Sequence, residues 1–254
     1  MATRMKSIAV YSLKGGVGKT TLAVTLGWAA ATLSSRRTLL WDLDPQGAAS
    51  FMLEGEERGS QRAQAVFSRD LDPSKLVQET SIPDLDLLGA DASLRKLDHI
   101  LFNLRQKKRL GKLIGRLADD YDYERIILDC PPGLTETTEQ VLRAADLTVV
   151  PLIPSPLSER TLDDVTDFLD RNGIRRGALL PVFNMAVRRR LIHSAALEEH
   201  PNWPVIPMTS IVEAMSGPDR AVGSLPRGSE AGQAILELWE TIERKLARTP
   251  SKAG

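Results

Sequence analysis

The sequence predicts an α/β fold, a doubly wound, mostly parallel sheet flanked by helices. Short apolar runs alternate with helical segments along the chain, a pattern typical of parallel βαβ units with right-handed crossovers. A glycine-rich segment separates the first apolar run from the first helical segment. No break in composition and no internal repeat divides the 254 residues, so we expect one domain that spans residues 1–254.

Each predicted strand is a short apolar run, and the first of them, SIAVYSL, is rich in residues that favour strands. The second and the fourth runs each end next to an aspartate. The expected strands are Ser7–Leu13, Thr38–Trp41, Asp86–Leu88, Arg125–Leu128, Leu147–Pro151, Ala178–Phe183 and Val205–Pro207. Residues 54–81 are polar and weakly patterned, and we expect loops with short helices there.

The predicted helices lie between these runs. The first is apolar almost all round because of its alanines and leucines, so it should be buried on more than one side. The expected helices are Thr20–Leu33, Ser93–Leu117, Thr137–Ala145, Glu159–Arg171, Leu191–His200 and Gly232–Leu246. We expect an interruption near Gly111, an N-cap at Ser158 and a frayed tail over residues 249–254.

The composition excludes several classes of protein. There are 33 basic and 33 acidic residues, so the chain is neither a generally basic nucleic-acid binder nor an acidic tail, and contact with DNA needs a local patch. The single cysteine, Cys130, cannot form an internal disulfide and is interpreted as structural, while the three histidines show no metal-ligand spacing. No apolar run reaches the roughly 18 residues of a membrane span, and we expect a cytoplasmic protein.

The segment after the first strand predicts a phosphate-binding loop. It reads Gly15, Gly16, Val17, Gly18, Lys19, Thr20 and Thr21, which matches the end of the P-loop pattern GxxxxGK[ST]. Leu13 stands where the first glycine of that pattern would be. Glycines let the backbone turn so that its N–H groups point at phosphates. The N-terminus of the following helix, with its unpaired N–H groups and its dipole, also favours the negative charge of a phosphate. We expect a nucleotide and Mg²⁺ as cofactors, with Lys19 at the β- and γ-phosphates, Thr20 on Mg²⁺ and Thr21 at the α-phosphate.

Lys14, directly before this loop, makes the motif more specific. KGGVGKTT resembles the deviant Walker A motif of the ParA/MinD family of ATPases. Two further blocks are similar to conserved blocks of that family, with the expected order and spacing. They are Leu39–Gly47, which ends in DLDPQG, and Ile126–Pro132, which resembles the Walker B strand. The resemblance extends from Ser7 to about Leu246, and no helix-turn-helix precedes the loop, as in short ParA proteins.

The resemblance implies that the nucleotide is ATP, and it implies roles for four charged residues. Lys14 would cross the interface of an ATP-dependent homodimer and contact the nucleotide of the other subunit, and it would be catalytic together with Lys19 and Asp42. Asp42 would position the attacking water. Asp129 would hold Mg²⁺ through water, and Asp44 would either do the same or order the switch loop. For both Asp42 and Asp44 a role as helix cap or turn former remains an alternative reading, more so for Asp44.

The resemblance also implies contacts to the adenine base. Family members use an asparagine after a late strand and the backbone near a late proline, and Asn184 and Pro207 match these by position. An arginine often follows that proline, and this chain has Met208 there.

Two stretches concentrate positive charge, Arg171–His193 and His99–Ala118, and neither contains an acidic residue. Such patches would bind DNA without sequence preference, although solvated helix faces remain the alternative for both. ParA proteins bind the nucleoid through basic residues late in the chain, which favours the first stretch. The DNA-binding candidates are Arg188, Arg189, Arg190, Arg220 and Arg227.

The expected function is a ParA-like ATP hydrolase whose dimer binds DNA and releases it when a ParB-type or analogous adaptor stimulates hydrolysis. Such a switch would position a DNA or protein cargo on the nucleoid. One alternative is a MinD-like membrane switch, but acidic residues interrupt the apolar face of Gly232–Leu246, so we expect no stable membrane association. The other is a P-loop synthase that activates a carboxylate, against which the DLDPQG and Walker B blocks argue.

Overall fold

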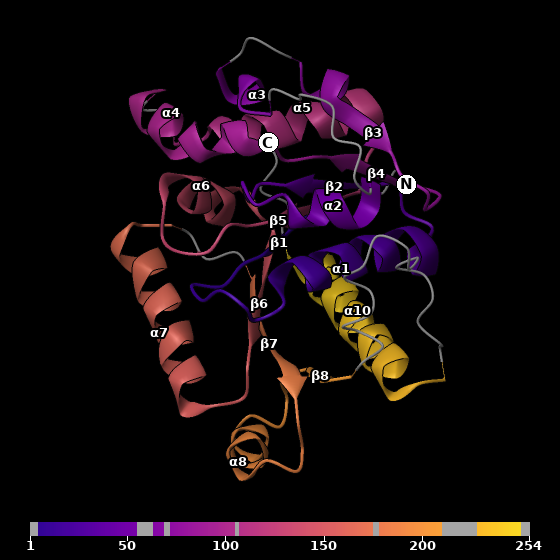
Figure 1. Cartoon of the computed structure of the whole chain (residues 1–254), viewed down its shortest axis with the longest axis vertical. Coiled ribbons are helices and arrows are strands. Elements are labelled where there is room, and N and C mark those ends of the chain that lie inside the picture. The colour runs from indigo at the N-terminus through magenta and orange to yellow at the C-terminus, as the bar shows by residue number, and fades with distance from the viewer. Residues whose placement is uncertain are drawn as a thin grey trace.

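The computed structural model describes residues 5–54, 63–68, 72–104, 107–174, 178–209 and 228–249. In this part of the chain one eight-stranded sheet has the order β3-β4-β2-β5-β1-β6-β7-β8 (Figure 1). The strands are β1 Lys6–Val10, β2 Thr38–Asp42, β3 Val77–Glu79, β4 Leu85–Leu88, β5 Arg125–Asp129, β6 Leu147–Leu152, β7 Ala178–Ala186 and β8 Val205–Pro207.

Helices connect the strands and cover the sheet. The α-helices are α1 Lys19–Ser34, α2 Ala48–Glu54, α3 Ala65–Ser68, α4 Leu97–Leu104, α5 Arg109–Tyr121, α6 Glu136–Ala144, α7 Pro156–Arg171, α8 Leu191–Glu199 and α10 Glu230–Arg248. Two short 3₁₀ helices, η1 Pro73–Leu76 and η2 Ala92–Lys96, flank the strands β3 and β4.

The described neighbouring strands pair in parallel, with the exception of β3, which runs antiparallel to β4. The predicted fold class, a mostly parallel α/β sheet, is therefore confirmed. The edge strand β3 was not predicted. It lies inside the segment 54–81, where we expected only loops and short helices. Three half-exposed or exposed residues, VQE, carry too short a pattern to reveal a strand.

Alternation of side chains along the strands divides the core between the two faces of the sheet. Ile8 and Val10 of β1 join a cluster with α1, α2 and α10, whereas Ala9 and Tyr11 join a cluster with α4, α5 and α6. Figure 1 shows α1 and α10 on one side of the sheet and α6 and α7 on the other. The predicted all-round burial of the first helix follows from its position between the sheet, α2 and α10.

The last helix, α10, packs on the sheet as predicted. Its apolar residues Ile235, Leu238 and Ile242 are buried in the cluster with α1. The guanidinium group of Arg125 also donates two hydrogen bonds, of 2.9 and 2.7 Å, to the carboxylate of Glu243. No helix in the described part of the chain combines the length and the apolar character needed to cross a membrane.

One prediction about helix ends is confirmed and one was wrong. The predicted helix Ser93–Leu117 is interrupted near Gly111, since α4 ends at Leu104 and α5 begins at Arg109, and Gly111 itself lies inside α5. Burial of the apolar face of α5 stabilises the helix against the flexibility of one glycine. The N-cap of α7 is Ser155 rather than Ser158, because Pro156 takes the first helical position that proline favours.

The tail predicted to be frayed lies outside the described residues except for Thr249, which is the C-cap residue of α10. Cys130 is fully buried in the cluster with α4, α5 and α6, and burial raises the pKa of its thiol. This environment agrees with the structural interpretation of the cysteine.

Candidate functional site

The loop between β1 and α1 has the geometry of an anion cradle. Gly16 and Gly18 have φ angles of 73° and 83°, in the left-handed region that favours glycine. Gly18 is the N-cap residue of α1 and provides no side chain to cap the helix. The backbone N–H groups of the first turn of α1 therefore face the loop and, together with the helix dipole, favour a phosphate there.

Lys19, the first residue of α1, is nearly buried, and its ammonium group points back into the loop. Its Nζ donates a hydrogen bond of 3.1 Å to the backbone carbonyl of Lys14. A buried ammonium group needs anionic or carbonyl partners, since removal from water disfavours its charge. The cradle therefore combines a fixed cation with the backbone N–H groups of a helix N-terminus, which is the combination that binds polyphosphate.

Two carboxylates stand side by side next to this loop. Asp42 ends β2 and Asp129 ends β5, and the two residues are direct partners in the register of the parallel pair. Both side chains are fully buried. Each follows the alternation of Leu40 and Ile127, which places it on the face of the sheet that α1 covers.

The carboxylate of Asp42 is held by hydrogen bonds. It accepts from the backbone N–H of Ser50 at 3.0 Å, from the Ser50 hydroxyl at 2.8 Å and from the backbone N–H of Asp44 at 3.1 Å. Burial raises the pKa of Asp42 to about 6, even though the bonds from Ser50 and Asp44 act in the opposite direction. The carboxylate is thus rigidly oriented and close to protonation near neutral pH.

Asp129 has no such support. Among the described residues, neither of its oxygens has a partner with normal hydrogen-bond geometry. Burial and the nearby charge of Asp42 raise the pKa of Asp129 well above its ordinary value, and the hydroxyl of Thr20 and the ammonium group of Lys19 only partly oppose them. A buried carboxylate beside a second carboxylate is unfavourable unless a cation joins them. Its oxygens and the hydroxyl of Thr20 are the donor type that Mg²⁺ prefers, so these residues fit the predicted metal.

Asp44 shapes the loop that follows β2. Its Oδ1 accepts a hydrogen bond of 2.9 Å from the backbone N–H of Gln46, and its carbonyl accepts one of 2.8 Å from Gly47, whose φ is 60°. The residue is therefore a turn former, as the alternative reading proposed. Its negative charge also raises the pKa of Asp129, and a contact of Asp44 with Mg²⁺ stays a prediction.

Lys14 lies half-buried at the edge of the loop and leans against α7. Its Nζ is 3.4 Å from the backbone carbonyl of Leu157, in the first turn of that helix. This is a long hydrogen bond at an exposed position, which contributes little to stability. The side chain can therefore leave this position at low cost, while its backbone carbonyl remains the partner of Lys19.

The structure brings Asn184, from β7, directly to the phosphate loop. Its Nδ2 donates a hydrogen bond of 2.8 Å to the carbonyl of Val17, and a Cβ added to Gly18 would lie only 2.4 Å from this nitrogen. Pro207 lies on the neighbouring strand β8, where it pairs with Ala186 of β7 in the same part of the sheet. Contact of Asn184 and Pro207 with a base stays a prediction.

Sequence reasoning missed Met185 as a member of this site. A Cβ on Gly18 would also come within 3.3 Å of the Met185 side chain, and Met185 has a φ of 56° at an irregularity in the pairing of β7 with β8. A methionine in the left-handed region is strained, and such strain persists where the surroundings fix the chain. No sequence signal marks this position, because methionine is not a residue that favours a positive φ.

The arginines of the first basic stretch are exposed where the structure describes them. Arg188, Arg189 and Arg190 are all exposed between β7 and α8, and Arg190 is the N-cap residue of α8. The next residue, Leu191, is 89% exposed. Arg220 and Arg227, the other two DNA-binding candidates, lie outside the described residues.

Several basic side chains of the second stretch, His99–Ala118, form contacts within the protein. Arg109 is buried, and its guanidinium group donates to the carbonyls of Val66 and Phe67. Lys107 lies 3.6 Å from the carboxylate of Glu139, and Arg116 forms an ion pair of 3.7 Å with Asp72. For these three residues the reading as internally paired or solvated charge is the better one.

Comparison with known sequences gives a family match and several related proteins. The profile of a family described as an AAA domain matches residues 5–174. The chromosome partitioning protein ParA of Myxococcus xanthus is 34% identical over 214 residues, which are 78% of this chain and 71% of that protein. The sporulation initiation inhibitor protein Soj of Bacillus subtilis is 35% identical over 149 residues. That alignment spans only 58% of Soj and 58% of this chain.

Comparison with solved structures gives matches over nearly the whole chain. The structure of apo McdA from Cyanothece has a TM-score of 0.80 at 21% identity and covers 96% of this chain and all of that one, which shows the likeness in fold. Cobyrinic acid a,c-diamide synthase of Mycobacterium smegmatis, solved with an ATP analogue and magnesium, has a TM-score of 0.75. It is 26% identical, with 97% of this chain and 99% of that chain covered.

Proposed function

The chain belongs to the ParA/MinD family of P-loop ATPases, and from this premise we propose that it is a ParA-type partition ATPase. In this proposal ATP joins two copies of the chain, the dimer binds DNA without sequence preference, and hydrolysis releases it. The observation that carries the proposal is the buried carboxylate of Asp129, which lies beside the phosphate loop. Its oxygens have no partner with normal hydrogen-bond geometry in the described part of the chain, and the Thr20 hydroxyl offsets its burial only in part. A structural aspartate would have a partner there.

The phosphate loop would hold the nucleotide. Backbone N–H groups from Gly15 to Thr21 would bind the phosphate oxygens, and Lys19 would exchange its bond to the Lys14 carbonyl for the β- and γ-phosphates. Thr20 would hold Mg²⁺ directly, and Asp129 and Asp44 would hold it through water. When bound, this ion would neutralise charge on the phosphates.

Asp42 would orient the attacking water and report the state of the nucleotide to the loop after β2. Its bonds to Ser50 and to the backbone of Asp44 tie this loop to the carboxylate pair. A change of charge at the phosphates would therefore alter the loop through a short, buried chain of contacts. The pKa of about 6 leaves Asp42 mostly ionised at neutral pH, able to accept a hydrogen bond from water.

Lys14 would join the subunits. Among the described residues, its ammonium group is held by a long bond to the Leu157 carbonyl alone, so the group could reach a nucleotide bound by the partner subunit. A cation supplied in trans would neutralise the charge that develops on the transferred phosphoryl group, as an arginine finger does. Two copies would then be held together only while the triphosphate is present.

The exposed arginines at positions 188–190 would be the DNA contact, doubled when two copies join. Each phosphate they neutralise would release counterions, so affinity should fall steeply as salt rises. The apolar face of α10 is buried against the sheet, which supports DNA rather than a membrane surface as the partner. A ParB-type or analogous adaptor would stimulate hydrolysis, and the protein would act on the nucleoid in the cytoplasm as one ATPase domain.

Isothermal titration calorimetry with ATP and Mg²⁺ tests the central observation. Asp129→Asn should lose the Mg²⁺ dependence of ATP binding, and Asp163→Asn, which changes an exposed carboxylate on α7, should bind as wild type does. Equal Mg²⁺ dependence in Asp129→Asn and wild type would remove the basis of the proposal. Steady-state hydrolysis should then be measured with and without DNA.

A second function, carboxylate activation in a small-molecule synthase, is favoured by the 26% identity to cobyrinic acid a,c-diamide synthase over 97% of the chain. The same hydrolysis assay separates the two functions. A partition ATPase hydrolyses ATP slowly without a small substrate and responds to DNA. Turnover that requires a small carboxylate and ignores DNA would identify a synthase.

A further inference from the structure

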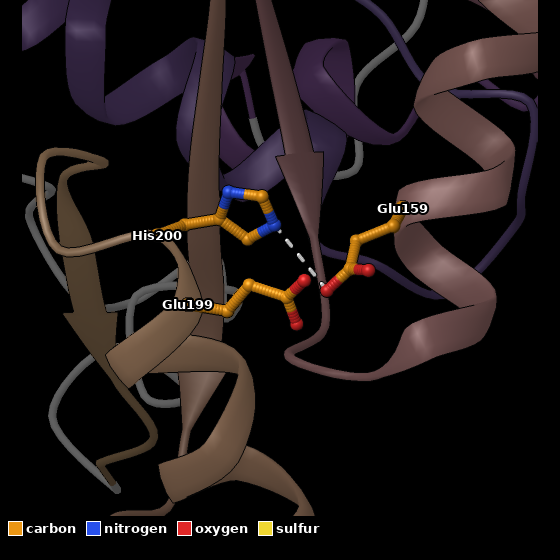
Figure 2. Close-up of side chains that lie close together, drawn as sticks. All are labelled: Glu159, Glu199 and His200. Atoms are coloured by element: carbon orange, nitrogen blue, oxygen red, sulfur yellow. Dashed lines mark ion pairs between the residues drawn. The ribbon is translucent and has the colours of Figure 1, made fainter.

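A second group of candidate ligands lies where α7 and the end of α8 meet. Glu159 belongs to the first turn of α7, Glu199 is the last residue of α8, and His200 follows as its C-cap residue. One ligand atom from each lies within 4.8 Å of the others, and the described part of the chain holds no second such group of three. Figure 2 shows the two carboxylates and the imidazole ring directed toward the same small region.

The histidine presents a buried, unsatisfied nitrogen to the two carboxylates. His200 Nε2 lies 3.4 Å from Glu159 Oε1, yet it is shielded from solvent and has no partner with hydrogen-bond geometry in the described residues. The ring stacks on Trp203, with centroids 3.9 Å apart and planes 13° apart, and Phe183 packs nearby at 6.0 Å. This packing fixes the direction of the nitrogen, which is what a metal ligand requires.

We propose that Glu159, Glu199 and His200 form a Zn²⁺ site. One imidazole nitrogen and two carboxylate oxygens match zinc, which commonly takes three protein ligands and a water molecule in catalytic-type sites. Mg²⁺ and Ca²⁺ prefer all-oxygen ligands, and a soft ion such as Cu⁺ would need sulfur ligands, which this group lacks. The 3.4 Å between His200 Nε2 and Glu159 Oε1 is about the separation of two ligand atoms on a tetrahedral ion with bonds of about 2.0–2.2 Å, and the Glu199 carboxylate would approach to complete the set.

A bound ion would connect two regions of the molecule. Glu159 is two residues from Leu157, whose carbonyl holds the Lys14 side chain, and α8 begins directly after the exposed arginines at 188–190. Zinc would therefore fix the end of α8 to the first turn of α7. The site is separate from the phosphate loop, and its existence does not depend on the proposed partition function.

Zinc titration of the tag-free, full-length protein tests the proposal. Excess Mg²⁺ is present to occupy the carboxylates near the phosphate loop. We expect one saturable Zn²⁺ per chain by calorimetry, and a rise in melting temperature of roughly 5–10 °C at 100 times the dissociation constant. Co²⁺ bound at the site should give the visible absorption of a four-coordinate ion.

Variants locate the ion. Glu159→Gln and Glu199→Gln should each weaken Zn²⁺ binding by more than the roughly 10–100-fold that loss of an outer-shell partner causes, and His200→Ala should abolish it. The matched controls are Glu198→Gln on the same helix and His99→Ala on α4, both exposed, and they should bind as wild type does. All variants should retain ATP binding.

Two results would overturn the proposal. One is the absence of saturable Zn²⁺ binding by the wild type, which would leave His200 and Glu159 as an ion pair. The other is binding that persists in the Glu199→Gln and Glu159→Gln variants, which would show an adventitious ion elsewhere. These glutamine variants keep the stacking of His200 on Trp203, so the test stands even if His200→Ala unfolds.

Discussion

Replacement of Asp42 by asparagine should change the stability of the nucleotide-free protein in a pH-dependent way. The pKa of this buried carboxyl rises from its ordinary 3.8 to about 6 on folding. The folded state thus binds the proton of Asp42 more tightly than the unfolded state does. The contribution of this one group to the free energy of unfolding is therefore greatest below pH 4 and is lost as the pH rises through 6. At 1.36 kcal/mol per pKa unit, the charge costs about 3 kcal/mol at pH 8 and about half of that at pH 5.

The variant removes this cost. Asp42→Asn should therefore gain on the order of 1–2 kcal/mol relative to wild type when the pH rises from 5 to 8, or roughly 2–8 °C in melting temperature for a chain of this size. The hydrogen bonds from Ser50 and Asp44 favour the ionised carboxylate, so their pH dependence is already contained in the pKa of about 6. The bonds that the asparagine itself makes do not titrate and shift only the baseline.

The measurement is chemical or thermal unfolding with EDTA present and nucleotide absent, for wild type and variant at pH 5 and pH 8. Asp163→Asn, at an exposed position on α7, is the control for general charge effects. Added Mg²⁺ should reduce the advantage of Asp42→Asn, because a cation would balance the carboxylate pair. A difference between variant and wild type that is the same at both pH values would refute the reasoning about the buried charge.

Three other substitutions test the proposed function. Lys14→Ala should keep the wild-type melting temperature, because only a long surface bond is lost, but should prevent ATP-dependent dimers in light scattering; dimers in this variant would contradict the role in trans. Gly18→Ala should abolish ATP binding in calorimetry, since its Cβ would collide with Asn184 at 2.4 Å and its φ is 83°; wild-type affinity would show that the loop rearranges freely. Charge reversal at Arg188–Arg190 should abolish DNA binding in low-salt anisotropy while ATP affinity is kept; unchanged DNA affinity would place the DNA surface elsewhere.

The fold and the phosphate site could be predicted because their signals are local. A glycine-rich loop after an apolar run predicts a strand, an anion cradle and a helix within a few residues, and the register of Asp42 with Asp129 then follows from parallel pairing. The pairing of β3 was not predictable, because an edge strand of three residues has too little periodicity. The N-cap of α7 depended on the choice between two serines, which Pro156 decides.

The sequence did not predict features that arise from tertiary packing. Arg109 lies in a basic run, and only the fold shows that its guanidinium group is buried against the carbonyls of Val66 and Phe67. The sequence likewise does not predict that Glu159 lies next to His200, because the two residues are 41 positions apart and match no short metal-ligand motif. Met185 contacts the phosphate loop through a backbone irregularity that no propensity predicts.

The order of strands in the sheet has a consequence for synthesis of the protein. β1 carries the phosphate loop, yet its neighbours β5 and β6 begin only at Arg125 and Leu147, and Asn184 comes later still. A nascent chain on the ribosome therefore displays the glycine-rich motif long before Asp129 and Asn184 exist to complete a nucleotide pocket. Acquisition of ATP by the emerging polypeptide would accordingly mark the moment at which β7 docks, and a truncation that ends before β7 should not retain the nucleotide.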